Sequence, residues 1–135
     1  MTTPIVAVCA AYHREDVEQM LEHAETECSL HNLSITSVVW VPGTLEIPLM
    51  VDRMLEADAT LGAFCLGIIE KGQTDHGLVI GQAVIKTLLE LQLIHDKPIG
   101  VGIIGPGAEG HHLPPRLEPH ARNAVQALLP FLETA

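Results

Sequence analysis

The segment Gly72-Gln73-Thr74-Asp75-His76 combines residue types that bind an anion with one that carries a proton. It follows an apolar run at residues 61–67 and opens a long run of helical period at about 75–93. Backbone N–H groups at the start of a helix bind anions, and glycine lets a ligand approach the backbone. An imidazole there can give or take a proton near neutral pH. The segment predicts a site for a small anionic substrate; the alternative is that His76 merely packs or forms a hydrogen bond on the helix.

The elements that must position this segment follow from the alternation of short apolar runs with segments of helical period. Such alternation is typical of an α/β fold with a parallel sheet covered by helices. Residues 105–119 hold four prolines, at positions 106, 114, 115 and 119, and predict an ordered loop. The expected strands are 5–10, 35–41, 61–67 and 99–104, and the expected helices are about 14–30, 45–56, 75–93 and 120–134.

A parallel sheet of this kind binds ligands beyond the carboxyl ends of its strands. Four segments follow those ends, namely residues 11–13, 43–46, 70–76 and the loop that begins at 105. We therefore expect these four segments to meet at one edge of the sheet and to form the site together.

Composition and charge narrow the class of protein. The 135 residues are 47% apolar and include 17 acidic and 7 basic residues, for a formal net charge of −10. This charge argues against nucleic acid or a membrane as a partner, and the apolar run 5–11 is too short to span a bilayer. Cys9, Cys28 and Cys65 show no metal-site spacing and are expected to be reduced, buried thiols. We expect a single domain over residues 1–135 and a cytoplasmic location.

A resemblance to a known family rests on three stretches of the chain. These are residues 39–48 with Val-Pro-Gly-x-x-Glu-Ile-Pro, residues 66–76 with Gly-x-Thr-x-His, and residues 98–104. The chain resembles the 6,7-dimethyl-8-ribityllumazine synthases from residue 5 to about residue 129. The resemblance implies a flavodoxin-like three-layer sandwich with a four-stranded parallel sheet. It also implies a transferase of riboflavin biosynthesis that condenses 5-amino-6-ribitylaminouracil with 3,4-dihydroxy-2-butanone 4-phosphate, without a metal or an organic cofactor.

The resemblance also implies roles for individual residues. His76 is the proton carrier, and Tyr12 stacks on the pyrimidine ring, an alternative to a core tyrosine at a strand end. Glu46 accepts the ribityl hydroxyls, although an acid there also suits the first turn of a helix. The other substrate-binding positions that the resemblance implies are Thr44, Leu45, Ile69 through its backbone, and Val101.

Phosphate binding is the remaining role that the resemblance implies. The N–H groups of Gly72, Gln73 and Thr74 combine with Arg116, which the adjacent subunit supplies. A guanidinium can hold phosphate through two parallel hydrogen bonds; the alternative for Arg116 is a solvated loop arginine. Family members form pentamers or multiples of pentamers, so the resemblance implies a homo-oligomer with sites between subunits.

Departures from the family pattern leave other functions open. Val101 stands where the family has a phenylalanine, Ala124 and Ala127 replace a lysine and a glutamate, and His120 lies at a position that is often lysine. These changes favour, as an alternative, a catalytically weak relative that binds flavin or lumazine. An archaeal-type riboflavin synthase is a further alternative, against which His76 argues.

Two other patterns predict no separate site. Residues 100–105 match Gly-x-Gly-x-x-Gly, but these glycines lie inside an expected strand and not in a strand-to-helix turn, which favours close helix packing. His111 and His112 with His120 suggest a metal, yet adjacent histidines are expected to point apart, and no spaced carboxylate or cysteine completes a ligand set. We interpret them as loop or subunit-interface residues.

Overall fold

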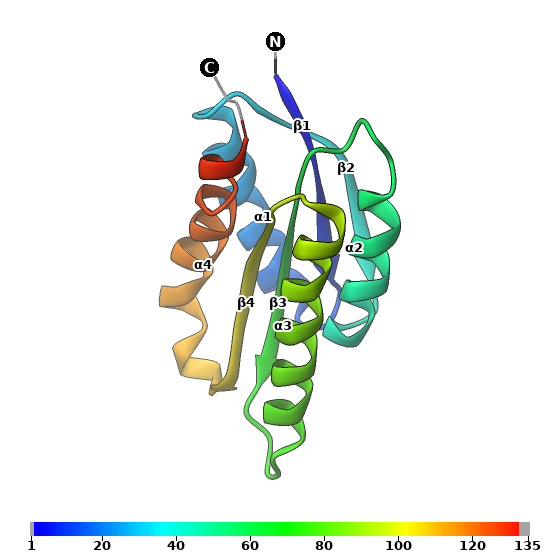
Figure 1. The fold of residues 1–135 in the computed structure, drawn as a ribbon. Helices are drawn as coiled ribbons and strands as arrows, with labels where there is room; N and C mark the ends of the chain where they lie inside the picture. The colour runs from blue at the N-terminus through cyan, green and yellow to red at the C-terminus, as the bar shows by residue number, and fades with distance from the viewer. Residues whose placement is uncertain (1, 133–135) are drawn as a thin grey trace.

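A parallel four-stranded sheet forms the middle layer of the computed structural model, which describes residues 2–132. Its strands lie in the order β2-β1-β3-β4, with two helices on each face (Figure 1). The α/β fold, flavodoxin-like and three-layered, is therefore confirmed. The strands are β1 (Thr3–Ala10), β2 (Leu33–Val41), β3 (Ala63–Glu70) and β4 (Ile99–Ala108); α1 (Arg14–Ser29) and α4 (Pro114–Gln126) cover one face, and α2 (Ile47–Leu55) and α3 (His76–His95) cover the other.

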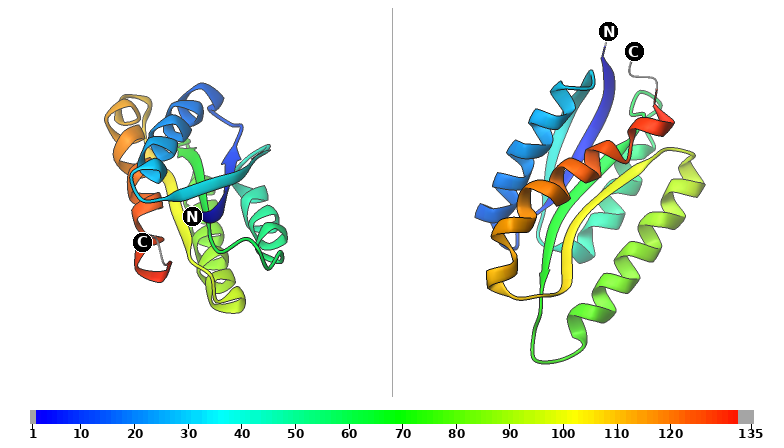
Figure 2. Two further views of the ribbon diagram at one scale, coloured as in Figure 1. Left: turned by 90° about the horizontal axis from the view of Figure 1, so that it is seen from above. Right: turned by 90° about the vertical axis from the view of Figure 1, so that its left-hand side faces the viewer.

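The central strands are apolar throughout because helices cover both of their faces. In β1, alternate side chains divide between two cores: Ile5 and Cys9 pack with the α1 and α4 side, whereas Val6 and Val8 pack with the α2 and α3 side. This division follows from the two-residue period of a strand. Figure 2 shows the sheet between its two helical layers from two further directions.

The glycines of β4 allow α4 to approach the sheet closely, as the sequence predicts. A Cβ atom on Gly100 would lie 1.8 Å from the carbonyl oxygen of Ala124, and one on Gly102 would lie 3.2 Å from the Ala124 Cβ. Any side chain at Gly100 would therefore push α4 away. The Gly-x-Gly-x-x-Gly pattern is a packing surface, and no helix begins at its last glycine.

The prediction of an ordered loop at residues 105–119 is wrong. Strand β4 continues to Ala108, a 3-10 turn covers Gly110–His112, and α4 already begins at Pro114. Prolines at the first two positions of a helix lose no hydrogen bond, because the N–H groups there have no partner within the helix. The buried residues Leu117, Ala121 and Val125 recur at helical spacing, so a helix places them all on the face that packs against the core.

Other element boundaries differ by a few residues. The last helix, expected to reach residue 134, ends at Gln126 and gives way to a 3-10 turn at Leu129–Phe131; residues 133 and 134 lie outside the described part. Strand β3 extends to Glu70, beyond its expected end at 67. A 3-10 turn at Thr44–Glu46 precedes α2, so the expected helix at 45–56 has two parts.

The three cysteines are free and buried, as expected. Burial is the largest effect on each thiol, and it raises the pKa of Cys9, Cys28 and Cys65 to about 12. Since the thiolate is the reactive form, we expect a disulfide reagent at about pH 8 to modify none of them in the folded protein. In denaturant the same reagent should modify three thiols per chain. Rapid modification of the folded protein would contradict the burial of these thiols.

Glu27 of α1 is buried and ties α1 to α4. Its carboxylate lies 3.0 Å from Arg122 Nη1 and 2.6 Å from His31 Nε2. Burial is the largest single effect and favours the neutral acid, but hydrogen bonds from His31, Arg122 and Gln126 together outweigh it, so the pKa of Glu27 lies below its usual value of 4.5.

A lowered pKa in the folded state makes the free energy of unfolding depend on pH. The ionised Glu27 contributes its full stabilisation above pH 4.5, the ordinary pKa, and loses it as the pH falls through the lower folded value. We expect urea unfolding to show a decrease in stability over this acidic range that Glu27→Gln reduces. An equal decrease in both proteins would contradict the prediction.

Candidate active site

The carboxyl ends of the four strands lie at one edge of the sheet, at the bottom of Figure 1. This edge carries a hollow of about 280 Å³ between the β3–α3 connection and the end of β4. Gly72, Gln73 and Thr74 form part of its wall, so the structure brings the predicted anion-binding segment to a cavity. The full lining comprises Glu70, Lys71, Gly72, Gln73, Thr74, Asp75, Gly77, Leu78, Pro106 and Gly107.

His76 is the first residue of α3 and is exposed. Its backbone N–H donates a hydrogen bond to Thr74 Oγ1 over 3.3 Å, which closes the turn that precedes the helix. Within residues 2–132 no side chain or backbone group binds its imidazole, so both ring nitrogens are available to a substrate. The alternative of a histidine that packs into the interior does not apply.

Charges around the hollow are mixed. Lys71 is the one cation in the lining, and its Nζ lies 4.0 Å from Glu109 Oε1. Glu70 and Asp75 add carboxylates on the same wall. An anion in this hollow could contact backbone N–H groups and Lys71 but would also meet these carboxylates.

Thr44, Leu45 and Glu46 follow β2 at the same edge but differ in exposure. Thr44 is buried, and its methyl carbon lies 3.0 Å from where Gly67 would carry a Cβ, so it packs against β3. Leu45 and Glu46 are exposed, and Glu46 Oε1 lies 3.4 Å from the corresponding position on Gly43. The carboxylate of Glu46 is thus folded over the Pro-Gly turn and accessible from solvent.

Tyr12 is an exposed aromatic ring just beyond β1, with 59% of its surface accessible, so it is not a core residue. Its ring meets that of His13 edge-on, with a centroid separation of 4.6 Å and an interplanar angle of 78°. An exposed ring at the ligand edge of the sheet can receive a planar heterocycle.

His13 and Glu70 form a contact that sequence reasoning missed. His13 Nε2 lies 3.1 Å from Glu70 Oε2, and the two residues are 57 positions apart in the chain. His13 also adopts a left-handed backbone conformation, with φ 61° and ψ 43°, immediately before α1. The sequence did offer one indication of this contact. His13 follows β1 and Glu70 ends β3, and these two strands lie side by side in the sheet.

The side chains of Ile69 and Val101 are less accessible to a ligand than those of Tyr12 and Glu46. The Ile69 side chain is buried, and its Cγ2 lies 3.2 Å from where Gly77 would carry a Cβ, so only its backbone can meet a ligand. Val101 is half-buried near the start of β4, paired with Cys65. The structure therefore does not bring Val101 to the edge where the other predicted residues lie.

Arg116 lies on the other side of the sheet from His76. It is exposed in the first turn of α4, and its Nη1 donates a hydrogen bond to the carbonyl oxygen of His112 over 2.9 Å. Helix α4 belongs to the layer of α1, whereas α3 belongs to the opposite layer. Arg116 is not among the residues that line the hollow at the Gly72 segment.

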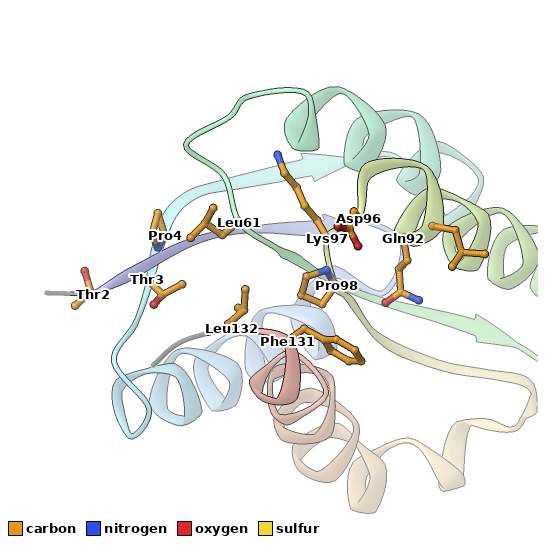
Figure 3. A pocket seen from close by; sticks show the side chains of 11 residues that line it. Thr2, Thr3, Pro4, Leu61, Gln92, Asp96, Lys97, Pro98, Phe131 and Leu132 are labelled. Carbon is orange, nitrogen blue, oxygen red and sulfur yellow. The ribbon is translucent and has the colours of Figure 1, made fainter. Parts of the chain in front are cut away.

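A larger hollow of about 980 Å³ lies at the opposite edge of the sheet, near the start of β1 (Figure 3). Its lining includes Leu61, Phe131 and Lys97. Lys97 Nζ already donates hydrogen bonds to the carbonyl oxygens of Leu55 and Ala57, over 2.7 and 3.1 Å. Among the residues that line it there is no histidine, cysteine or serine, so the smaller hollow is the better candidate for chemistry.

The expectation for the adjacent histidines needs a correction. The rings of His111 and His112 lie 4.0 Å apart, and together with Glu109 they bring possible ligand atoms within 4.8 Å of one another. A short turn draws these side chains together because Glu109 and His112 bind each other's backbone in a capping box. His120 is not part of this group; its Nδ1 lies 3.2 Å from the carbonyl oxygen of Arg116.

Comparisons with known proteins agree with this arrangement. A family model described as 6,7-dimethyl-8-ribityllumazine synthase matches residues 3–135. A protein of that name from Staphylothermus marinus is 38% identical over 109 residues, which cover 81% of this chain and 73% of the relative. Another from Metallosphaera sedula is 35% identical over 120 residues, which cover 89% and 80% of the two chains.

A third relative of the same name, from Saccharolobus solfataricus, is 29% identical over 126 residues, or 93% of this chain and 82% of its own. The family match spans all four strands and both helical layers, including the β3–α3 connection with His76. This chain belongs to the 6,7-dimethyl-8-ribityllumazine synthase family.

Proposed function

We propose that the edge formed by the carboxyl ends of the strands performs the reaction of this family in a single catalytic domain. There, 5-amino-6-ribitylaminouracil condenses with 3,4-dihydroxy-2-butanone 4-phosphate to give 6,7-dimethyl-8-ribityllumazine, phosphate and water. The observation that supports this site most strongly is the imidazole of His76 at the start of α3, which is exposed and has no partner within residues 2–132. The neighbours of His76 in the chain, Asp75 and Gly77, line the hollow together with Gly72, Gln73 and Thr74.

His76 serves as the proton carrier in this proposal. Formation of the imine requires a proton on the departing water, elimination of phosphate requires removal of a proton from carbon, and ring closure requires further proton transfers. Imidazole can take and return protons because its ordinary pKa lies near neutrality. The N–H groups of Gly72, Gln73 and Thr74 hold the phosphate next to it, and Lys71 adds a positive charge at the same wall.

The pyrimidine and its ribityl chain occupy the part of the edge next to β1 and β2. Tyr12 supplies the face on which the ring stacks, and the backbone of Ile69 pairs with the edge of the ring. The Glu46 carboxylate accepts ribityl hydroxyls, with Thr44 and Leu45 at its side. The exposure of Tyr12 and Glu46 at the same edge supports this placement.

A homo-oligomer, a pentamer or a multiple of it, would complete the site. In this proposal a neighbouring subunit supplies Arg116, which lies in the other helical layer from His76, to the phosphate, and Val101 likewise reaches the ring from a neighbour. Helix α3 supports subunit contacts because it presents a largely apolar, exposed surface. Its exposed side chains include Leu78, Val79, Leu89, Leu93 and Ile94.

The same helix is long and apolar enough to cross a membrane, and 17% of that stretch is buried within the chain. It packs against α2 and β4, and it carries the proposed catalytic histidine at its first turn. We therefore assign its exposed apolar side chains to contacts between subunits of a cytoplasmic enzyme.

The alternative of a catalytically weak binding relative rests on the replacements at Val101, Ala124 and Ala127. Ala124 is buried against Gly100 and Gly102 of β4, so a lysine side chain would not fit there in this chain. That replacement is thus explained by packing and does not itself argue for lost activity.

Turnover separates the two functions. The purified protein is mixed with both substrates while the absorbance of the lumazine and the release of phosphate are followed. We expect both to form much faster than in the absence of protein. Binding of the lumazine without faster product formation would favour the binding relative and contradict the proposed function.

A further inference from the structure

We propose that Glu70 and His13 form a positioning pair that holds the Tyr12 ring and thereby sets the affinity of the enzyme for the uracil substrate. The inference rests on the role proposed above for Tyr12. Its basis is a continuous chain of three side chains, in which Glu70 contacts His13 and His13 contacts Tyr12.

The first link joins His13, the residue before α1, to Glu70 at the end of β3. His13 Nε2 and Glu70 Oε2 are 3.1 Å apart, and the two side chains are only 22% and 37% exposed. Partial burial weakens the competition of water for this contact, so the carboxylate can fix the orientation of the imidazole. On its other side, His13 Nδ1 lies 3.9 Å from Asp16 Oδ2 of α1.

The second link is the edge-on contact between the His13 and Tyr12 rings. Among residues 2–132 this is the one ring contact that Tyr12 makes, and most of the tyrosine surface faces solvent. His13 is therefore the neighbouring ring that can orient Tyr12. Arg14, the next residue, does not compete for this contact because its guanidinium lies over the Trp40 ring at 4.0 Å.

The position of Glu70 makes the pair part of the site. Glu70 ends β3 and lines the hollow together with Lys71 and Gly72. The pair therefore connects the proposed anion site with the aromatic face proposed for the pyrimidine. Neither His13 nor Glu70 needs to touch a reacting atom for this role, which makes them positioning residues.

Steady-state kinetics of the whole protein, with each substrate varied in turn, test the pair. We expect Glu70→Ala to raise KM for the uracil substrate by about 3- to 10-fold, the range of one lost aromatic or hydrogen-bond contact. Glu70→Gln should retain most of the affinity because its amide oxygen still accepts from His13. A change that results only from the lost negative charge would appear equally in both variants.

Asp52→Ala provides the matched control. Asp52 Oδ1 lies 2.7 Å from His95 Nε2, so this variant also removes a carboxylate from a histidine, but between α2 and α3. We expect its KM values to equal those of the wild type. An unchanged KM for the uracil substrate in Glu70→Ala, or an equal increase in Glu70→Gln, would overturn the proposal.

A second measurement reports on the environment of the Tyr12 ring. Tyr12 is the one tyrosine of the sequence, so 3-fluorotyrosine labelling gives a single ¹⁹F resonance. We expect Glu70→Ala to shift this resonance and Glu70→Gln and Asp52→Ala to leave it nearly in place. No shift in Glu70→Ala would contradict the proposed link.

Tyr12→Ala separates failure of the pair from failure of the site. If Tyr12→Ala raises KM for the uracil substrate and Glu70→Ala does not, the proposed role of the Glu70–His13 pair is wrong, and the proposed role of Tyr12 in binding the pyrimidine ring is retained. If Tyr12→Ala also leaves KM unchanged, the proposed ring site is wrong, and the pair is overturned with it.

Discussion

His76→Ala is expected to lower kcat by about 10²- to 10⁴-fold, the contribution typical of a general acid-base group. The imidazole is exposed at the first turn of α3 and has no partner among the described residues, so its removal leaves no cavity and breaks no internal contact. KM for both substrates should change little, because the backbone of Gly72 to Thr74 and the Tyr12 ring remain. Initial rates of lumazine formation give both parameters.

His23→Ala is the control for this substitution. His23 lies on α1, where its Nδ1 is 3.6 Å from Glu118 Oε2, far from the β3–α3 connection in sequence and on the other helical layer. It should retain the wild-type rate. A His76→Ala enzyme with the kcat of the wild type would remove His76 from the catalytic role.

Arg116→Ala should raise KM for the phosphate substrate by about 10- to 100-fold, because a charged hydrogen bond contributes about 1.5 to 3 kcal/mol. Arg116 is solvent-exposed in the single chain, and within the described part of the chain its guanidinium makes one hydrogen bond, to the His112 carbonyl oxygen, so the loss should not destabilise the fold. KM for the uracil substrate should remain near that of the wild type. Equal KM values for the phosphate substrate in both proteins would contradict the assignment.

Mixing the two variants tests whether the site lies between subunits. His76→Ala and Arg116→Ala are unfolded together and refolded, so that mixed assemblies form. Where an Arg116→Ala subunit provides His76 and its His76→Ala neighbour provides Arg116, an intact site results. We expect the mixture to be more active at low phosphate-substrate concentration than either variant refolded alone, each of which should keep only its own reduced activity. A mixture no more active than the average of the two variants would contradict a site between subunits.

The sequence was sufficient to predict the strands and most helices because the pattern of apolar residues in each element reflects which of its faces are buried. The central strands are short apolar runs because helices cover both of their faces, and the spacing of apolar residues in α1 follows from the face that meets the sheet. The start of α4 was missed because Pro114, Pro115 and Pro119 suggested a loop. Prolines at the first two positions of a helix lose no hydrogen bond, and the buried period from Leu117 onward carried the helical signal.

The candidate site was predictable in part for a similar reason. The rule that ligands bind beyond the carboxyl ends of strands placed Tyr12, Glu46 and His76 at one edge, and the structure agrees with that placement. The contact between His13 and Glu70 was not predictable, because it depends on a left-handed backbone at His13 and on side-chain orientations 57 residues apart. The burial of Ala124 likewise requires knowledge of how closely α4 approaches Gly100.

A crystal structure of the protein with 6,7-dimethyl-8-ribityllumazine and inorganic phosphate tests the central claim most directly. We predict phosphate bound to the N–H groups of Gly72 to Thr74, with the His76 imidazole facing the lumazine and the lumazine ring on Tyr12. Ligands bound instead in the larger hollow between Leu61 and Phe131, with the β3–α3 connection empty, would contradict it.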